Sequence, residues 1–116
     1  MSVRVRRVHD PPEPEDGTRV LVDRLWPRGV SKAAARVDEW PKEITPSTEL
    51  RRWYHAGEGS HEEFARRYEA EPAAPEAAEL LDHVRELAAE GPVTLLTATK
   101  EPERSHTAVL ARLLGA

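Results

Sequence analysis

A nearly unbroken apolar run at residues 19–23 (RVLVD) sets the tightest limit on the fold. A strand with one wet face alternates apolar and polar residues, whereas a strand covered on both faces is apolar throughout. A second run, residues 93–96 (VTLL), follows a helical pattern that Pro75 opens and Gly91 ends. Buried strands separated by a helix are typical of parallel sheets, which need long crossover connections.

The remaining elements are predicted from spacing and from capping residues. Val3, Val5 and Val8 predict a first strand, with Arg4 and Arg6 on its other face. The Pro-rich, acidic stretch that follows (DPPEPEDG) must be a loop.

Three serines are placed where helices should begin. Ser31, Ser47 and Ser60 can each accept a hydrogen bond from a backbone N–H in the first helical turn. A last helix is predicted over residues 103–114 from its apolar spacing.

These patterns together predict an α/β fold. We expect a small, mostly parallel sheet flanked by helices in a compact three-layer arrangement, similar to Rossmann or flavodoxin folds. The chain has 116 residues, 39% of them apolar, which suits a single domain over residues 1–116. The order of the strands cannot be predicted from these patterns.

Composition excludes several classes of protein. The absence of cysteine removes disulfides, thiolate metal sites and cysteine nucleophiles. There is no apolar run of 18 residues, and the first ten residues lack a signal-peptide pattern, so we expect a cytoplasmic protein without membrane contact. The net charge is −4, with +2 in residues 1–52 and −6 in residues 53–116, which disfavours a broad nucleic-acid surface.

Polar segments follow both buried strands, at residues 23–29 (DRLWPRG) and 97–100 (TATK). Ligands bind beyond the carboxyl ends of parallel strands, so the two segments should converge if their strands are neighbours. The cations and the start of the last helix favour a phosphate or carboxylate ligand. The predicted ligand-binding residues are Arg24, Trp26, Arg28, Thr97, Thr99, Lys100 and Ser105, and the candidate catalytic residues are Asp23 and His106.

Each candidate also has a structural interpretation. Asp23 could form an ion pair with Arg24 or Arg28 that fixes the turn. Trp26 could cover the end of the strand, and His106 could be a packing residue. Further polar residues fit structural roles too, Thr99 and Ser105 as helix caps and the Arg51-Arg52 pair as a solvated helix face.

Known catalytic and metal-binding motifs are missing. The chain has no GxGxxG, P-loop or GxSxG sequence, and His55 and His61 lack the HExxH spacing of zinc sites. Ser105 and His106 are adjacent on a predicted helix and therefore point about 100° apart, which prevents a nucleophile–base pair. We therefore expect no metal and no cofactor.

Four stretches, RVLVDRLWPRGVSK, EITPSTELRRWYHA, FARRYEAE and GPVTLLTATKEPERSH, resemble the YeaO-like branch of the family called domain of unknown function 488. The resemblance covers nearly the whole chain, from about Val3 to Leu114. It implies a compact bacterial cytoplasmic α/β domain and no settled activity. Asp23, Arg24 and Pro27 match the wider family's Asp-x-Arg…Pro segment with an offset of one residue.

The resemblance breaks at two cysteines. A CAE-type segment and a Cys-His-Arg triplet of the wider family read here as residues 97–99 (Thr-Ala-Thr) and 105–107 (Ser-His-Thr). His106 matches, whereas both cysteines and the arginine do not, so any thiol chemistry of other branches is impossible in this chain.

Three hypotheses follow. The pocket binds an anionic small molecule, as a binding module or a degenerate enzyme. Alternatively, Asp23 and His106 catalyse a reaction on an anionic metabolite. The third alternative is a nucleic-acid or protein interaction module that uses the Arg/Trp-rich first half, namely Arg24, Trp26, Arg28, Arg51, Arg52 and Trp53. The oligomeric state stays open.

Overall fold

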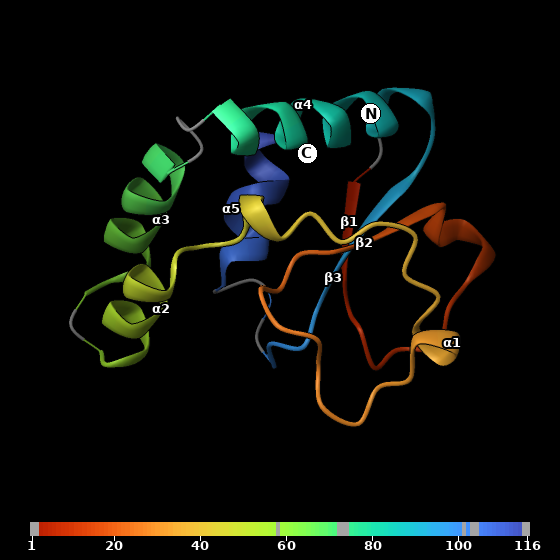
Figure 1. Ribbon diagram of the computed structural model, residues 1–116, viewed down its shortest axis with the longest axis horizontal. Coiled ribbons are helices and arrows are strands. Elements are labelled where there is room, and N and C mark those ends of the chain that lie inside the picture. The colour runs from red at the N-terminus through yellow and green to blue at the C-terminus, as the bar shows by residue number, and fades with distance from the viewer. Residues whose placement is uncertain (1–2, 58, 72–74, 101, 103–104, 115–116) are drawn as a thin grey trace.

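The computed structural model describes residues 3–57, 59–71, 75–100, 102 and 105–114. Its centre is a three-stranded parallel sheet made of β1 (Val3–Arg7), β2 (Thr18–Leu21) and β3 (Val93–Thr97), in the order β1-β3-β2. The sequence therefore predicted the parallel α/β class correctly. The late strand β3 lies between the two early ones, so β2 and β3 are direct neighbours (Figure 1).

Among the described residues five α-helices pack around the sheet, and the predicted serine caps start three of them. Their bounds are α1 (Lys32–Ala35), α2 (Thr48–His55), α3 (His61–Ala70), α4 (Pro75–Glu90) and α5 (His106–Leu113). Two 3-10 turns, η1 (Pro14–Asp16) and η2 (Lys42–Ile44), lie in the loops. The side chains of Ser31, Ser47 and Ser60 accept from backbone N–H groups of Ala34, Leu50 and Glu63.

Two predicted boundaries differ from the observed ones. β1 ends at Arg7, and Val8 lies beyond it, although the Val8 N–H still donates to the Thr97 carbonyl at 2.8 Å. The last helix starts at His106 and is capped by Ser105, whereas the prediction began it at residue 103. Residues 103 and 104 lie outside the described residues.

The two faces of the sheet pack against different kinds of cover. One face carries Val20, Val22, Val93 and Leu95, which pack in one core cluster with residues of helices α2 to α5. Leu21 and Leu96 point to the other face and pack with Ala35 of α1 and with irregular chain that includes Trp26 and Trp40. Figure 1 shows α1 well apart from the other four helices. The second covering layer is therefore thin, and loops supply most of it.

A buried carboxylate on this second face forms ion pairs with three strand arginines. Arg4, Thr94 and Arg19 are in register across the sheet, and Asp16 lies against them with no exposed surface. Asp16 forms ion pairs with Arg4 at 3.1 Å, with Arg6 at 3.0 Å and with Arg19. Burial raises the pKa of Asp16. The hydrogen bonds from the Glu13 backbone N–H, Arg6 and Arg19 lower the pKa by more, so the net pKa is below its usual range.

Candidate functional site

The polar segments after β2 and β3 meet at one cavity, because parallel neighbouring strands end at the same edge. The cavity has a volume of about 780 Å³, within the range of small-molecule sites. Its walls come from the β2 and β3 ends, from α2 and α3 and from the start of α5. The lining residues are Asp23, Arg24, Leu25, Trp26, Pro27, Arg28, Pro46, Arg51, Tyr54, His55, Phe64, Ala98, Thr99, Lys100, Ser105 and His106.

Asp23 is held by groups from β3 and α5. Its Oδ1 accepts from the Thr97 hydroxyl at 2.7 Å, and its Oδ2 accepts from the Ala98 backbone N–H at 2.8 Å. His106 Nε2 lies 3.3 Å from Oδ1. Burial raises the pKa of Asp23, but the hydrogen bonds from His106, Ala98 and Thr97 outweigh it and leave the pKa below its usual range.

The ion pair of Asp23 with Arg24 or Arg28, its alternative structural interpretation, does not form among the residues that the structure describes. The imidazole Nε2 of His106, on α5, lies 3.3 Å from Asp23 Oδ1 instead. Arg24 instead donates from Nε to the Pro46 carbonyl at 3.2 Å and from Nη2 to the Thr45 carbonyl at 3.1 Å. The reason is geometric, because the turn after β2 directs Arg24 toward the chain that enters α2.

The hydrogen bonds of His106 fix its tautomer. Nε2 lies 2.6 Å from the Val22 carbonyl oxygen, which can only accept a hydrogen bond. Nε2 therefore carries the proton, and Nδ1 is the acceptor nitrogen in the neutral ring. The ring also makes an edge contact with Tyr68, with centroids 6.4 Å apart. His106 thus combines a packing role with a position on the cavity wall.

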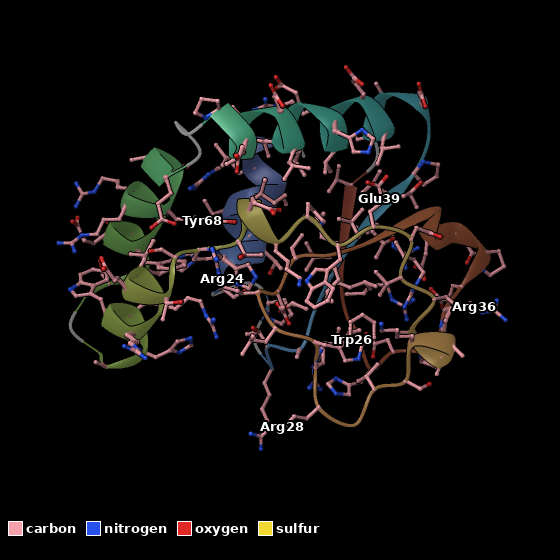
Figure 2. The ribbon with its side chains drawn as sticks, in the orientation of Figure 1. Arg24, Trp26, Arg28, Arg36, Glu39 and Tyr68 are labelled. Carbon is pink, nitrogen blue, oxygen red and sulfur yellow. The ribbon has the colours of Figure 1, made fainter. Side chains whose placement is uncertain are left out.

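The other two predicted site residues of the first polar segment, Trp26 and Arg28, differ in exposure. Trp26 is half-buried; its Nε1 donates to the Val30 carbonyl at 2.7 Å, and its ring meets Trp40 edge-on at 5.5 Å. Arg28 is exposed at the rim, and Figure 2 shows its side chain extending away from the ribbon, whereas Arg24 lies near Tyr68. Arg28 is therefore the more accessible of the two arginines.

Residues of the second polar segment have two different roles: Thr97 supports Asp23, whereas Thr99 and Lys100 line the cavity. Thr97 is fully buried and is not among the lining residues, so its hydroxyl serves Asp23. Thr99 and Lys100 both line the cavity. Ser105 caps α5 by accepting from the Thr107 N–H, and its hydroxyl donates to the Pro102 carbonyl at 2.8 Å.

Sequence reasoning missed the wall that α2 and α3 supply. Arg51, Tyr54 and His55 are spaced i, i+3 and i+4, which places them on one face of α2. That spacing was the available signal, but the Arg51-Arg52 pair was interpreted as a solvated face. Arg52 is exposed, whereas Arg51 is half-buried and lines the cavity. Phe64 of α3 stacks on Tyr54 at 4.4 Å.

Positive charge predominates in the cavity. Four permanent cations, Arg24, Arg28, Arg51 and Lys100, line it together with one carboxylate. Within the described ranges, no three or more His, Asp or Glu side chains are grouped in a way that could hold a metal ion. The cavity can therefore offer charge-assisted hydrogen bonds to an anion.

A model of the DUF488-N3i family, described as the inactive DUF488-N3 subclade, matches residues 2–116. The chain belongs to the DUF488 family. This DUF488 protein is 48% identical over 113 residues to an uncharacterised protein of Mycobacterium tuberculosis, covering 97% of this chain and 93% of the relative. It is 44% identical over 111 residues to the uncharacterised protein YeaO of Escherichia coli, covering 96% and 95%. No solved structure matches.

In this DUF488 protein, the Ser105 hydroxyl is held by hydrogen bonds within the fold. Ser105 is 7% exposed, and its Oγ lies 2.6 Å from Thr107 Oγ1 in addition to its contacts with Pro102 and the helix. Asp23 likewise has both oxygens engaged. Among the helices that the structure describes, none is long and apolar enough to cross a membrane.

Proposed function

We propose that this DUF488 protein binds an anionic small molecule, carrying a phosphate or carboxylate group, in the cavity at the strand ends. The charge of the cavity carries the proposal. Four permanent cations line it, and the one carboxylate, Asp23, is already hydrogen-bonded by Thr97, Ala98 and His106. The chain as a whole has a net charge of −4, so this local excess of cations is not a general property of its surface.

Binding without turnover fits the hydroxyl and carboxylate contacts better than catalysis. A nucleophile needs a base within hydrogen-bond reach, whereas the contacts of Ser105 are to Pro102 and Thr107. The description of the matching subclade as inactive agrees with this proposal.

The concave placement of the basic residues disfavours the nucleic-acid alternative. Arg24 and Arg51 line a cavity, and the ring of Trp53 is covered by the Arg67 guanidinium at 4.1 Å. A nucleic-acid groove presents cations and uncovered rings along a continuous surface.

Calorimetric titration and thermal shifts with phosphate, sulfate, carboxylates and sugar phosphates test the proposal. A ligand at ~100 times its dissociation constant stabilises the folded state by roughly 2.7 kcal/mol. Arg51→Gln and Lys100→Met should each weaken binding about tenfold or more, because each removes a charge-assisted hydrogen bond. Arg24→Ala is a poorer test, because it also releases the Thr45 and Pro46 carbonyls.

Arg52→Gln is the matched control, because Arg52 is the next residue on α2 and is exposed outside the cavity lining. It should leave anion binding unchanged. Equal losses in Arg51→Gln and Arg52→Gln would point to diffuse surface electrostatics, and no response to any anion would refute the proposal.

A second candidate function rests on the Asp23–His106 pair. A carboxylate beside one imidazole nitrogen orients the ring and leaves Nδ1 to exchange a proton with a ligand. If the protein turns over a bound anion, His106→Gln should abolish turnover while Arg52→Gln leaves it intact. Binding that persists with no turnover of any bound anion would exclude this role.

A further inference from the structure

We infer that the ligand of the cavity is a planar aromatic anion, such as an aryl phosphate or a nucleotide, rather than a bare inorganic ion. The inference rests on the proposed anion site and names its ligand class. Three observations carry it: the size of the cavity, the apolar character of its walls, and aromatic rings that are fixed in place on more than one wall.

The cavity is much larger than a small anion needs. Its volume of about 780 Å³ compares with roughly 30 Å³ for one water molecule in the liquid. Apolar and aromatic side chains, Leu25, Trp26, Pro27, Tyr54 and Phe64 among them, share the lining with the cations. A bare phosphate would leave this apolar surface wet, whereas an organic body attached to the anion would cover it.

Aromatic side chains on the helical wall form a stack. Tyr54 and Phe64 lie 4.4 Å apart with ring planes at 16°, and Phe64 continues to Tyr68 at 5.9 Å. His55 adds a second ring of α2 next to Tyr54, with centroids 6.1 Å apart. Stacked rings keep a defined orientation, so a planar ligand meets a preformed surface.

A second wall, formed by the chain after β2, supplies Trp26. Its Nε1 is fixed on the Val30 carbonyl, and its ring packs edge-on against Trp40. Trp40 is held in turn by its own donation to the Asp23 carbonyl at 2.6 Å. An aliphatic body gains only the burial of apolar surface on these rings, whereas a planar aromatic body gains stacking energy in addition.

Cations accompany the rings on both walls. Arg51 lies one turn before Tyr54 and His55 on the same face of α2, and Arg28 and Lys100 belong to the strand-end wall. An anionic group next to an aromatic ring can therefore meet a cation while the ring meets an aromatic side chain. This pairing favours aromatic phosphates over long-chain fatty acids.

The test compares phenyl phosphate with cyclohexyl phosphate and inorganic phosphate by calorimetric titration of the full chain. The two esters share charge and ring size and differ in planarity and π-electrons. Phenyl phosphate should bind about fivefold more tightly than cyclohexyl phosphate, since stacking adds to area burial. Adenosine monophosphate, as a nucleotide probe, should likewise bind more tightly than ribose 5-phosphate.

Variants at Tyr54 identify the responsible wall. Tyr54→Leu should remove the preference for phenyl over cyclohexyl phosphate, whereas Tyr54→Phe should keep it. If Tyr54→Leu proves unstable without ligand, His55→Ala replaces it as the test. His55→Ala leaves the Tyr54–Phe64 stack in place and should reduce the preference for phenyl phosphate.

The outcomes separate the two proposals. Equal affinity for the two esters, or tighter binding of cyclohexyl phosphate, would overturn the aromatic inference and leave the anion site standing. Failure of every phosphate probe to bind, together with no response to the carboxylates, would overturn both. Preference for phenyl phosphate that survives in both Tyr54→Leu and His55→Ala would overturn the assignment of the ring to the α2 wall.

Discussion

The Nε2 atom of His106 lies 3.3 Å from Oδ1 of Asp23 and 2.6 Å from the carbonyl oxygen of the preceding residue, Val22. One imidazole thereby joins the first turn of α5 to the chain just after β2. Asp23 is also bonded to Thr97 and Ala98, so the same carboxylate links the ends of β2 and β3. Asp23 and His106 therefore connect the ends of β2 and β3 with the start of α5 through hydrogen bonds. We expect these connections to stabilise the fold through the charge of Asp23.

We predict that Asp23→Asn makes the folded protein less stable by roughly 1–2 kcal/mol at pH 7, because the amide cannot accept every hydrogen bond that the carboxylate accepts. The pKa of Asp23 is lowered in the folded state, so its contribution is complete above the unfolded pKa of about 3.9. That contribution is lost as the pH falls through the lower folded-state pKa. Urea unfolding of both proteins between pH 7 and pH 2.5 measures the difference.

The gap between wild type and Asp23→Asn should be smaller at pH 2.5 than at pH 5. Asp16 also has a lowered pKa, but it is present in both proteins and cancels in the comparison. A gap that does not change with pH would mean that the ionised state of Asp23 contributes nothing to folding.

The architecture was predictable because its signals are local. Apolar runs identified the buried strands, and Ser31, Ser47 and Ser60 marked the helix starts through their own hydrogen-bonding chemistry. The strand order was not predictable, because β3 could lie at either edge of the sheet or, as observed, between β1 and β2. No local pattern encodes that choice, which is made by packing of the two sheet faces.

Asp16 provides the second prediction. Its carboxylate is completely buried and is shared by three arginines, of which Arg19 is only 4% exposed. Asp16→Asn should destabilise the fold by about 3 kcal/mol, because it leaves buried guanidinium charge without its counter-ion. Glu13→Gln changes a carboxylate at the edge of the same cluster, where the side chain is 48% exposed, and should cost less than about 1 kcal/mol.

Denaturant unfolding of the two variants tests whether the arginines need a buried counter-ion or only a nearby negative charge. Similar losses for Asp16→Asn and Glu13→Gln would show that total charge, rather than burial, controls the cluster.

Arg36 provides the third prediction. It ends α1 in the left-handed region, at φ 49° and ψ 49°, with its N–H donating to the Lys32 carbonyl. Glycine adopts this conformation without steric cost, so Arg36→Gly should stabilise the protein by about 0.5–1 kcal/mol. Ala33→Gly, inside the same helix, should destabilise it by about 1 kcal/mol. Thermal unfolding measures both, and a loss of stability in Arg36→Gly would mean that its side chain outweighs the backbone cost.

The site was predictable in part. Residues after β2 and β3 were identified because the ends of parallel strands share an edge, and most of them line the cavity. The partners were not predictable, because Asp23 is bound by His106 from 83 positions later in the chain and Arg24 by the chain before α2. Which face of α2 turns inward also depends on tertiary packing, and Arg51 was therefore misassigned.

Gly17 and Gly57 provide the last prediction, as a matched pair. Both have a positive φ, 62° and 76°, so alanine is strained at either position. At Gly17 an added Cβ would lie 2.2 Å from the Pro92 carbonyl oxygen, which already accepts from the Thr18 N–H. At Gly57 it would meet no described atom within 4 Å.

Gly57→Ala should therefore cost only the conformational strain, about 1 kcal/mol, whereas Gly17→Ala adds a backbone clash and should cost about 2–4 kcal/mol. Chemical denaturation of both variants gives the two values. If the costs are equal, the approach of Gly17 to Pro92 is relaxed without loss, and the entry into β2 tolerates a wider separation from β3. A larger cost at Gly17 would mean that the close approach of these two chain segments cannot relax to accept a Cβ.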